Sequence, residues 1–375
     1  MDCYFDEQRA VEVEVPINIA LIKYWGKRNE DLILPLNSSL SLNIDGLVAR
    51  TRLRCSSKIS DSVTVNNTSV DLEKSKRFRK CFDYARQLIR GRSCHENTGP
   101  HLETEYGFEV SSTTNFPVGA GLASSAAGFA AIAVSIGELF DLSMVDVSSL
   151  ARIGSGSACR SVFGGLVEWY SGSDQSGSDC VVKQVFPENW WPELRALIVV
   201  LDPTEKEVGS SIGMRRSVET SELLKHRINE VVPKRIERLK VAFQSRDFDE
   251  FARITMADSN QLHAICLDTC PPLKYMSDAS WYVVRAVNEF NSGNRRRAAY
   301  SFDAGPNACI FVENNNVVGF LQQLCRYFKF PPKVIFNLES IEDHFEIPQD
   351  VNPSTSFAIR DIIVSEVGGS PRIIT

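Results

Sequence analysis

Residues 106–140, YGFEVSSTTNFPVGAGLASSAAGFAAIAVSIGELF, limit most strongly what this chain can fold into. Tyr106, Phe108 and Val110 alternate with other residues, which predicts a strand. Residues 117–121 are rich in glycine and predict a loop. From Ser124 onward apolar residues recur on every side, as in a helix that is buried all round. A short loop between a strand and a core helix is not a flexible linker. It is either a tight structural turn or a place where a ligand touches the backbone.

The chemistry of this loop suits an anion. The first N–H groups of a helix are unpaired and carry partial positive charge, so they attract phosphate. Gly119 and Gly121 remove side chains that would block close approach. Ser124 and Ser125 place hydroxyls in the first turn, where they can cap the helix or contact a phosphate or its metal. No lysine follows the glycines as in a Walker loop. The alternative is a serine-capped helix after a glycine turn.

The bulk properties narrow the class of protein. A chain of 375 residues exceeds the size at which a single core usually stops growing, which favours two lobes. Lys+Arg 41 against Asp+Glu 47 gives a net charge of −6, which argues against a general nucleic-acid binder. No run approaches the ~18 apolar residues of a membrane helix. The start, MDCYFDEQRA, has the character of neither a signal peptide nor a transit peptide. Ten cysteines without a CxxC pair indicate reduced thiols in a cytoplasmic protein without a zinc site.

The N-terminal lobe, placed at residues 1–194, is expected to mix strands and helices. A strand is predicted over 11–15, interrupted by Pro16, and a hairpin over 39–55 with its turn at Asp45-Gly46. A charged surface helix is predicted over 71–90, capped by Ser69 or Asp71. Residues 149–170 predict a helix, a small-residue break at 154–157 and then a strand.

The C-terminal lobe, placed at residues 195–375, is expected to begin with a strand at Arg195. Residues 209–266 are mostly helical, with Pro233 at a helix start. A further helix is predicted over 280–291, and a strand, a turn and a second strand over 297–313. This order predicts an α+β fold rather than a regular parallel β-α-β array.

Three more clusters could carry chemistry. Asp303 lies in SFDAGPNA, where a lone aspartate is either a turn-former or a reactive carboxylate. In GSGSACRS, hydroxyls gather with one guanidinium, which suits a fixed carboxylate or phosphate but could form a surface salt bridge. GSSIGMRRS adds two hydroxyls and two guanidiniums. The run 295–297 is expected to be a solvated face. The residues of the second and third clusters are Ser155, Ser157, Arg160, Ser210, Ser211, Arg215 and Arg216.

Taken together, five motifs resemble the diphosphomevalonate decarboxylase family of the GHMP kinase superfamily. They are NIALIKYWGKR, NFPVGAGLASSAA, GSGSACRS, GMRRSVETS and SFDAGPNA, in the order of that family, and the resemblance extends from Val11 to about Gly369. The superfamily usually has GLGSS where this chain has GLASS, and a glycine-rich third motif where it has DAGPN. Both departures match the decarboxylase branch.

The resemblance implies a two-lobed GHMP-kinase-like fold. Its N-terminal lobe would be ribosomal-protein-S5-domain-2-like and its C-terminal lobe ferredoxin-like, with the active site in the cleft between them. It also implies ATP with Mg²⁺, a homodimer, and the conversion of (R)-5-diphosphomevalonate to isopentenyl diphosphate, with ADP, phosphate and CO₂. This reaction belongs to the mevalonate pathway of isoprenoid and sterol precursor biosynthesis.

The resemblance assigns roles to individual residues. Asp303 is the catalytic carboxylate, Arg160 with Ser157 holds the substrate carboxylate, and Lys23 lies near the phosphates, although it could instead form a structural ion pair. Ser124 is the candidate for direct phosphate contact and for Mg²⁺ held through ATP. The substrate site is shaped by Tyr24, Lys23, Ser155, Ser210 and Met214, and the nucleotide phosphates by Gly119, Ala120, Gly121, Leu122, Ala123, Ser124 and Ser125.

Two other functions remain open on the sequence. A related enzyme would be a decarboxylase or 3-kinase that acts on mevalonate or mevalonate phosphate, and product analysis separates it from the first. A protein without catalysis would be a nucleotide-binding regulator on the same scaffold. Loss of Asp303 or of the glycine loop would favour the regulator, and this chain retains both.

Overall fold

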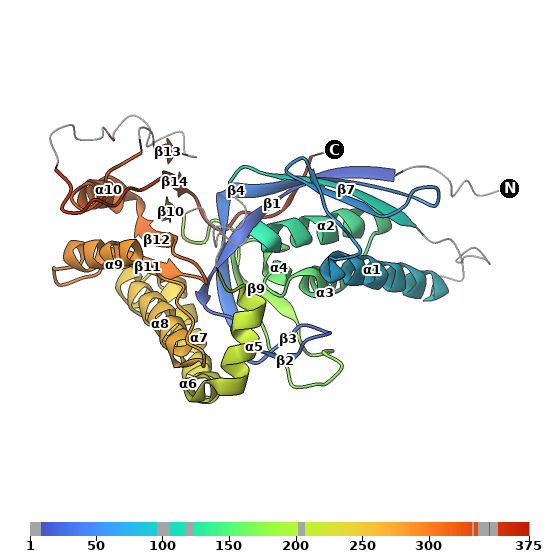
Figure 1. Cartoon of the computed structure of the whole chain (residues 1–375), viewed down its shortest axis with the longest axis horizontal. Helices are drawn as coiled ribbons and strands as arrows, with labels where there is room; N and C mark the ends of the chain where they lie inside the picture. The colour runs from blue at the N-terminus through green and yellow to red at the C-terminus, as the bar shows by residue number, and fades with distance from the viewer. Residues whose placement is uncertain are drawn as a thin grey trace.

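The computed structural model describes residues 9–95, 106–116, 124–201, 207–331, 334–336, 345 and 352–374. It shows a mixed α+β fold of two lobes, each with its own sheet, which confirms the predicted class (Figure 1). Among the described residues, no helix combines the length and the apolar character needed to cross a membrane.

The first lobe is built on an eight-stranded sheet. Its main path runs β15-β1-β4-β7-β5-β6, and β8 pairs with both β4 and β9. Helix α2 packs against β1 and β4, and α1 and α3 lie beyond it (Figure 1). The strands are β1 (Arg9–Ile22), β4 (Ser39–Ser56), β5 (Ser62–Val65), β6 (Thr68–Ser69), β7 (Gly107–Thr114), β8 (Leu166–Trp169), β9 (Val182–Phe186) and β15 (Arg372–Ile373), and the helices are α1 (Lys76–His95), α2 (Ser124–Phe140), α3 (Met144–Gly154) and α4 (Ala158–Ser161).

The predicted hairpin with its turn at Asp45-Gly46 is wrong. One long strand, β4, runs through this dipeptide and pairs along its length with β1. The register changes where Pro16 pairs with Val48 but Ile17 pairs with Ile44, so the dipeptide lies in a bulge. The C-terminal segment holds this bulge, because Gly369 donates its N–H to Asp45 and Gly46 donates to Ser365 Oγ. The Asp45-Gly46 dipeptide therefore does interrupt the regular strand, but it forms a bulge and not a hairpin turn.

The surface helix starts later than predicted. Asp71 accepts the N–H groups of Glu73 and Lys74 in a turn, and α1 begins only at Lys76. The buried helix after the glycine loop is confirmed as α2. The predicted helix, small-residue break and strand are also confirmed, since α3 ends at Gly154 and β8 follows the short α4.

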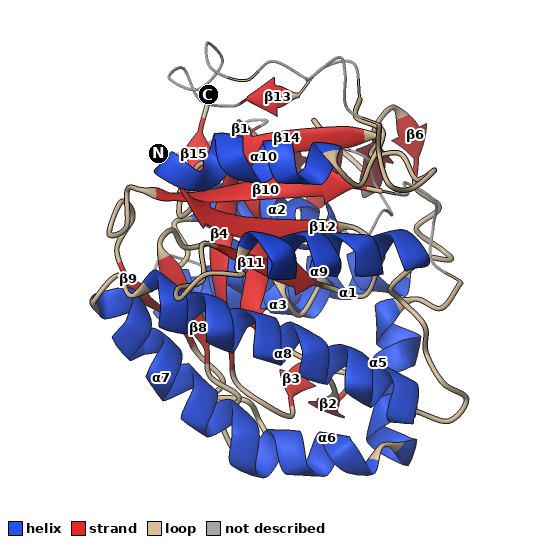
Figure 2. Ribbon diagram, turned by 90° about the vertical axis from the view of Figure 1, so that its left-hand side faces the viewer, coloured by secondary structure: helices blue, strands red, loops and turns tan. Residues whose placement is uncertain are grey.

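The second lobe is built on a five-stranded sheet of order β11-β12-β10-β14-β13. Figure 2 shows α7, α8 and α9 across the front of this lobe. Its strands are β10 (Leu194–Val200), β11 (Ala298–Phe302), β12 (Ala308–Glu313), β13 (Ile335–Phe336) and β14 (Asp361–Ser365). Its helices are α5 (Ser210–Thr220), α6 (Glu222–His226), the π-helix η1 (Arg227–Val231), α7 (Val232–Gln244), α8 (Phe248–Asp268), α9 (Asp278–Phe290), the 3-10 turn η2 (Asn314–Asn316) and α10 (Val317–Cys325). Apart from the two large sheets, β2 (Lys27–Asn29) and β3 (Leu34–Pro35) form a separate two-stranded sheet.

Most elements predicted for this lobe are confirmed, including the strand near Arg195, the helix over 280–291 and the strand–turn–strand over 297–313. Pro233 lies in the first turn of α7, directly after the π-helix. The run 295–297 is not simply a solvated face. Arg296 pairs with Asp249, and the Arg297 guanidinium stacks 4.2 Å from the Phe290 ring centroid.

Candidate active site

The catalytic residues predicted in the two lobes meet in one ion pair. Lys23 follows the end of β1, and Asp303 follows the end of β11. Lys23 Nζ lies 2.5 Å from Asp303 Oδ1 and 2.6 Å from Ser301 Oγ. The lysine is 2% exposed and the aspartate 28% exposed, so solvent-sized groups can still reach the carboxylate. This contact joins residues that are 280 positions apart in the chain.

Asp303 also lies in a turn, as the alternative reading proposed. Its carbonyl accepts the N–H of Gly305 at 2.8 Å, and Asn307 Oδ1 accepts the N–H of Leu201 at 2.7 Å. The carboxylate of Asp303, however, binds Lys23 rather than its own turn. The turn therefore presents the side chain to the other lobe. Asp303 is both part of a turn and a carboxylate available for chemistry, so the two alternatives do not exclude each other.

Arg160 is buried among neutral acceptors. Its Nε donates to Ser41 Oγ at 2.9 Å and to Asn18 Oδ1 at 3.2 Å, Nη2 donates to Asn18 at 3.0 Å, and Nη1 donates to Ser39 Oγ at 2.7 Å. The Trp169 ring lies 5.9 Å away. Burial lowers the pKa of the guanidinium from its ordinary value, against the opposing effect of nearby groups. Within the described residues, no carboxylate lies within ion-pair distance of it.

The acceptors around Arg160 were not assigned from the sequence. Asn18 belongs to the first motif, and its amide donates to the Ser157 carbonyl at 3.0 Å and to Ser161 Oγ at 2.7 Å. Ser39 and Ser41 are two apart on β4, so they point to the same face. Polar residues at alternate positions of an otherwise apolar strand were the signal that could have found them.

Tyr24 and the small residues of the break pack together. A Cβ on Gly156 would lie 3.0 Å from a Tyr24 ring carbon, so the glycine permits this approach. The Tyr24 ring also lies 4.8 Å from that of Trp169. Burial raises the pKa of the Tyr24 hydroxyl well above its ordinary value. That hydroxyl is buried and has no hydrogen-bond partner in the described part of the chain.

The start of α2 reaches the same break. Gly119, Ala120, Gly121, Leu122 and Ala123 lie outside the described residues, and Ser124 is the first residue of α2. Ser125 Oγ lies 3.4 Å from Ser155 Oγ, which connects the predicted nucleotide loop to the predicted substrate residues. Ser157, in turn, holds Asn18 and through it Arg160.

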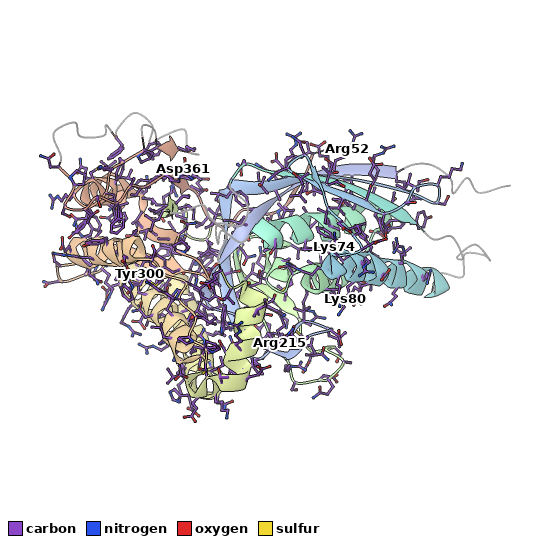
Figure 3. All side chains as sticks on the ribbon, viewed as in Figure 1. Arg52, Lys74, Lys80, Arg215, Tyr300 and Asp361 are labelled. Carbon is purple, nitrogen blue, oxygen red and sulfur yellow. The ribbon has the colours of Figure 1, made fainter. Side chains whose placement is uncertain are left out.

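The first turns of α5 supply the remaining predicted residues. Ser210 is its first residue, and the buried Met214 packs in an apolar cluster with Trp25 and Ala304. Ala304 directly follows Asp303, so the same cluster includes the residue next to the carboxylate. Arg215, labelled in Figure 3 beside β2 and β3, lies 3.8 Å from Glu30.

The comparisons with known proteins cover both lobes. Residues 15–182 match the diphosphomevalonate decarboxylase-like N-terminal domain, and residues 196–374 match the mevalonate 5-diphosphate decarboxylase C-terminal domain. The chain belongs to the diphosphomevalonate decarboxylase family. The Danio rerio diphosphomevalonate decarboxylase is 41% identical over 97% of this chain and 92% of that protein.

Solved structures of the family have the same fold. The mevalonate diphosphate decarboxylase from Trypanosoma brucei superposes with a TM-score of 0.88 at 35% identity, over 98% of each chain. A structure described as MDDEF in complex with MVAPP, AMPPCP and magnesium superposes with a TM-score of 0.78 at 28% identity, over 98% of this chain and 99% of that one. The two-domain organisation of the decarboxylase family is therefore present in this chain.

Proposed function

We propose that this chain catalyses the ATP-dependent decarboxylation of (R)-5-diphosphomevalonate to isopentenyl diphosphate, with ADP, phosphate and CO₂. The observation that carries the proposal is the contact of Lys23 with Asp303 between the lobes, together with a buried Arg160 that has no ion-pair partner among the described residues and whose charged form Asp303 favours. The active site would lie in the cleft between an S5-domain-2-like N-terminal lobe and a ferredoxin-like C-terminal lobe. We place the boundary of the lobes at residues 194 and 195, where β10 begins.

Asp303 is the group that receives the proton of the substrate's tertiary hydroxyl. An ordinary aspartate has a pKa near ~4 and cannot ionise an alcohol beforehand. In a loose phosphoryl-transfer transition state it need not, because the proton becomes acidic only as the new P–O bond forms. Lys23 fixes Oδ1, and Oδ2 accepts no hydrogen bond within the described residues. Oδ2 is therefore the oxygen that can orient the hydroxyl and accept its proton.

Arg160 holds the substrate carboxylate. A guanidinium has five N–H donors, and the described acceptors occupy Nε–H and one N–H on each terminal nitrogen. One N–H on Nη1 and one on Nη2 remain, which is the number that a carboxylate can accept. When phosphate leaves the tertiary carbon, positive charge develops there and the neighbouring carboxylate departs as CO₂. Arg160 aligns this carboxylate with the breaking bond.

ATP supplies the phosphoryl group that turns the hydroxyl into a leaving group. Gly119 to Ser125 would contact its phosphates at the start of α2, because free N–H groups at a helix start favour anions. Mg²⁺ usually keeps few protein ligands and binds substrate phosphates. We assign to Ser124, the first residue of α2, the role of assisting a Mg²⁺ held mainly by ATP.

The remaining assignments complete the substrate site. The partnerless Tyr24 hydroxyl fits a polar ligand group, since buried polar atoms are nearly always hydrogen-bonded. Ser155, Ser157 and Ser210 would add hydroxyls, and Met214 an apolar wall. We also propose that the chain acts in the cytoplasm as a homodimer, which sedimentation equilibrium and imaging of the tagged protein can test.

The direct test is product analysis. Purified protein is incubated with ATP, Mg²⁺ and diphosphomevalonate, and ADP and CO₂ are counted; mevalonate and mevalonate phosphate are assayed in parallel. The proposal expects equal amounts of ADP and CO₂, with diphosphomevalonate as the preferred substrate. ADP without CO₂ would make the protein a kinase.

Substitution of the proposed base gives the second test. Asp303→Asn removes the proton acceptor and should lower kcat by about 10²–10⁴-fold, the usual effect of general-base removal. The affinity for ATP should stay unchanged. Asp278→Asn, an exposed carboxylate on α9, is the matched control and should keep full activity. Activity of the Asp303 variant within threefold of wild type would reject the assigned role.

A further inference from the structure

Two consecutive residues of α8 hold both halves of the catalytic pair. Asp258 Oδ1 accepts the backbone N–H of Lys23 at 2.8 Å. The next residue, Ser259, accepts the backbone N–H of Phe302 at 2.9 Å, and Phe302 directly precedes Asp303. Asp258 is 0% exposed and Ser259 1% exposed. One rigid helix therefore fixes the backbone on both sides of the Lys23–Asp303 contact.

The Asp258 carboxylate is itself locked by two guanidiniums. Arg227 donates to its Oδ1 at 2.8 Å and its Oδ2 at 2.9 Å, and Arg235 donates to Oδ2 at 2.9 Å. Burial alone would raise the pKa of Asp258, but the attraction of Arg227 and Arg235 outweighs burial and the pKa lies below its ordinary value. The carboxylate is therefore a charged, fixed acceptor for the Lys23 backbone.

The Lys23 peptide is held on its carbonyl side as well. Its oxygen accepts from Arg227 Nη2 at 2.9 Å and from Asn37 Nδ2 at 3.0 Å. Lys23 lies just beyond the last residue of β1, where the strand ladder ends. Side chains thus replace the ladder bonds at the residue whose ammonium contacts Asp303.

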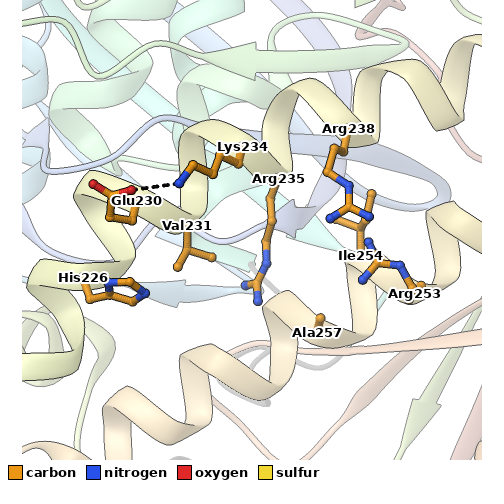
Figure 4. A pocket seen from close by; sticks show the side chains of 9 residues that line it. All are labelled: His226, Glu230, Val231, Lys234, Arg235, Arg238, Arg253, Ile254 and Ala257. Carbon is orange, nitrogen blue, oxygen red and sulfur yellow. Dashed lines mark hydrogen bonds and ion pairs between the residues drawn. The ribbon is translucent and has the colours of Figure 1, made fainter.

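The outer end of this network reaches a groove of about 330 Å³ between α7 and α8. Figure 4 shows Arg235 pointing from α7 toward the helix that carries Ala257. The other cations of the groove are paired, Lys234 with Glu230, and Arg238 and Arg253 with Glu250. Arg235 has a side chain that is 19% exposed, so it can be changed with less disturbance than the fully buried Arg227.

We propose that Asp258 and Ser259 are positioning residues that set the separation of the Lys23 ammonium and the Asp303 carboxylate. The proposal rests on the proposed function of this pair. The two residues touch no substrate atom in this scheme and act only through the backbone of Lys23 and Phe302. A productive site has to be held to within ~0.5 Å, and one helix that binds both segments meets that demand across two lobes.

The test uses Ser259→Ala, the mildest variant, which leaves the Phe302 N–H without its acceptor. Because a misplacement of ~1 Å can cost about 10²-fold in rate, kcat should fall by roughly 10- to 100-fold. KM for ATP and diphosphomevalonate should stay within about twofold, and an unchanged unfolding midpoint would show that the lower kcat does not come from a loss of folded enzyme. Asn260→Ala is the matched control. It removes a 3.0 Å bond to the hydroxyl of Tyr300, labelled in Figure 3, on the same strand but further from Asp303.

A second pair of variants addresses Asp258. Asp258→Asn keeps an oxygen for the Lys23 N–H, whereas Asp258→Ala removes it, so the asparagine variant should retain more of kcat at equal unfolding midpoint. Arg235→Lys should likewise retain more than Arg235→Gln. If Ser259→Ala and Asn260→Ala lose kcat equally, the positioning role is overturned.

A crystal structure of Ser259→Ala separates this proposal from the proposed function. The distance from Lys23 Nζ to Asp303 Oδ1, 2.5 Å in the unchanged chain, should lengthen by ~0.5 Å or more. An unchanged distance contradicts the inference even in an active enzyme. If the wild-type protein releases no CO₂, the proposed function fails, and this distance still decides whether α8 sets the geometry.

Discussion

Arg160 and Arg227 are both buried guanidiniums, at 2% and 0% exposure, yet their surroundings differ in charge. Arg227 on η1 donates to both oxygens of Asp258, to Gln261 and to the Lys23 carbonyl. Arg160 on α4 donates, among the described residues, to neutral oxygens of serine and asparagine side chains.

The difference separates a structural cation from a binding cation. A buried charge is costly unless an opposite charge accompanies it. Arg227 meets that condition within its own lobe, where it pairs with Asp258, so it needs no ligand to balance its charge. Arg160 has no ion-pair partner within the described residues, since Asp303 acts on it only from beyond ion-pair distance, and a substrate carboxylate would complete its surroundings. Strongly perturbed buried groups of this kind gather at functional sites.

Between these two arginines, the larger effect on catalysis is expected from Arg160→Gln. Removal of a preorganised donor that acts on developing charge typically costs about 10²–10³-fold in kcat. The free energy of unfolding should change little, because the variant removes a buried charge without an ion-pair partner but also loses the hydrogen bonds to Asn18, Ser39 and Ser41. Steady-state kinetics and urea unfolding measure both quantities. An effect confined to KM for diphosphomevalonate would show that Arg160 only binds, and would break the comparison.

The next effect is on stability, by Arg227→Met. This variant leaves the buried Asp258 with Arg235 as its remaining cation, and breaking a buried pair in this way costs about 3–5 kcal/mol of unfolding free energy. Urea denaturation of the purified variant gives the value. Arg285→Met is the control, since its pair with Glu289 is exposed and worth only ~0–1 kcal/mol. Equal losses in the two variants would mean that the buried pair is not structural.

The smallest effect concerns His263, a buried basic side chain like Arg160 and Arg227. Unlike them it stays neutral, so it avoids the free-energy cost of burying a charge. Burial, followed by the nearby Lys23, lowers its pKa from 6.5 to about 4, although Asp303 acts in the opposite direction. The unfolded chain then binds the proton more readily, so the folded state is favoured above pH 6.5 and loses this advantage as the pH falls toward 4. His263→Gln should remove about 2 kcal/mol of the stability difference between pH 7 and pH 5. An unchanged pH profile of urea unfolding would show that His263 does not carry that difference.

The sequence predicted the residues of the candidate site better than it predicted the contacts that hold them in place. Lys23, Asp303 and Arg160 lie in motifs, and the structure brings the first two into contact. The bulge at Asp45 could not be predicted, because the residues that shape it arrive from 365 and 369. A local pattern contains no information on which distant segment will bind a turn-forming dipeptide.

The role of α8 was missed for a related reason. Asp258, Ser259, Asn260 and Gln261 form four consecutive polar residues in a helix whose neighbouring turns are apolar. Such a run predicts a solvated turn, but the first two of these residues are fully buried. An interruption of the apolar stripe on a core helix was the only available signal, and the two backbone groups that it binds, at Lys23 and Phe302, lie more than 40 residues away.

Strand β15, formed by residues 372–373, pairs with β1 at the edge of the first-lobe sheet. Ile373 pairs with Val13, and the N–H of Ile374 donates to the Glu12 carbonyl at 2.7 Å. During synthesis, one edge of β1 therefore stays uncovered until residues 372–373 have been made, and an uncovered edge invites pairing with other chains. The first and last strands described by the structure are thus neighbours in one sheet.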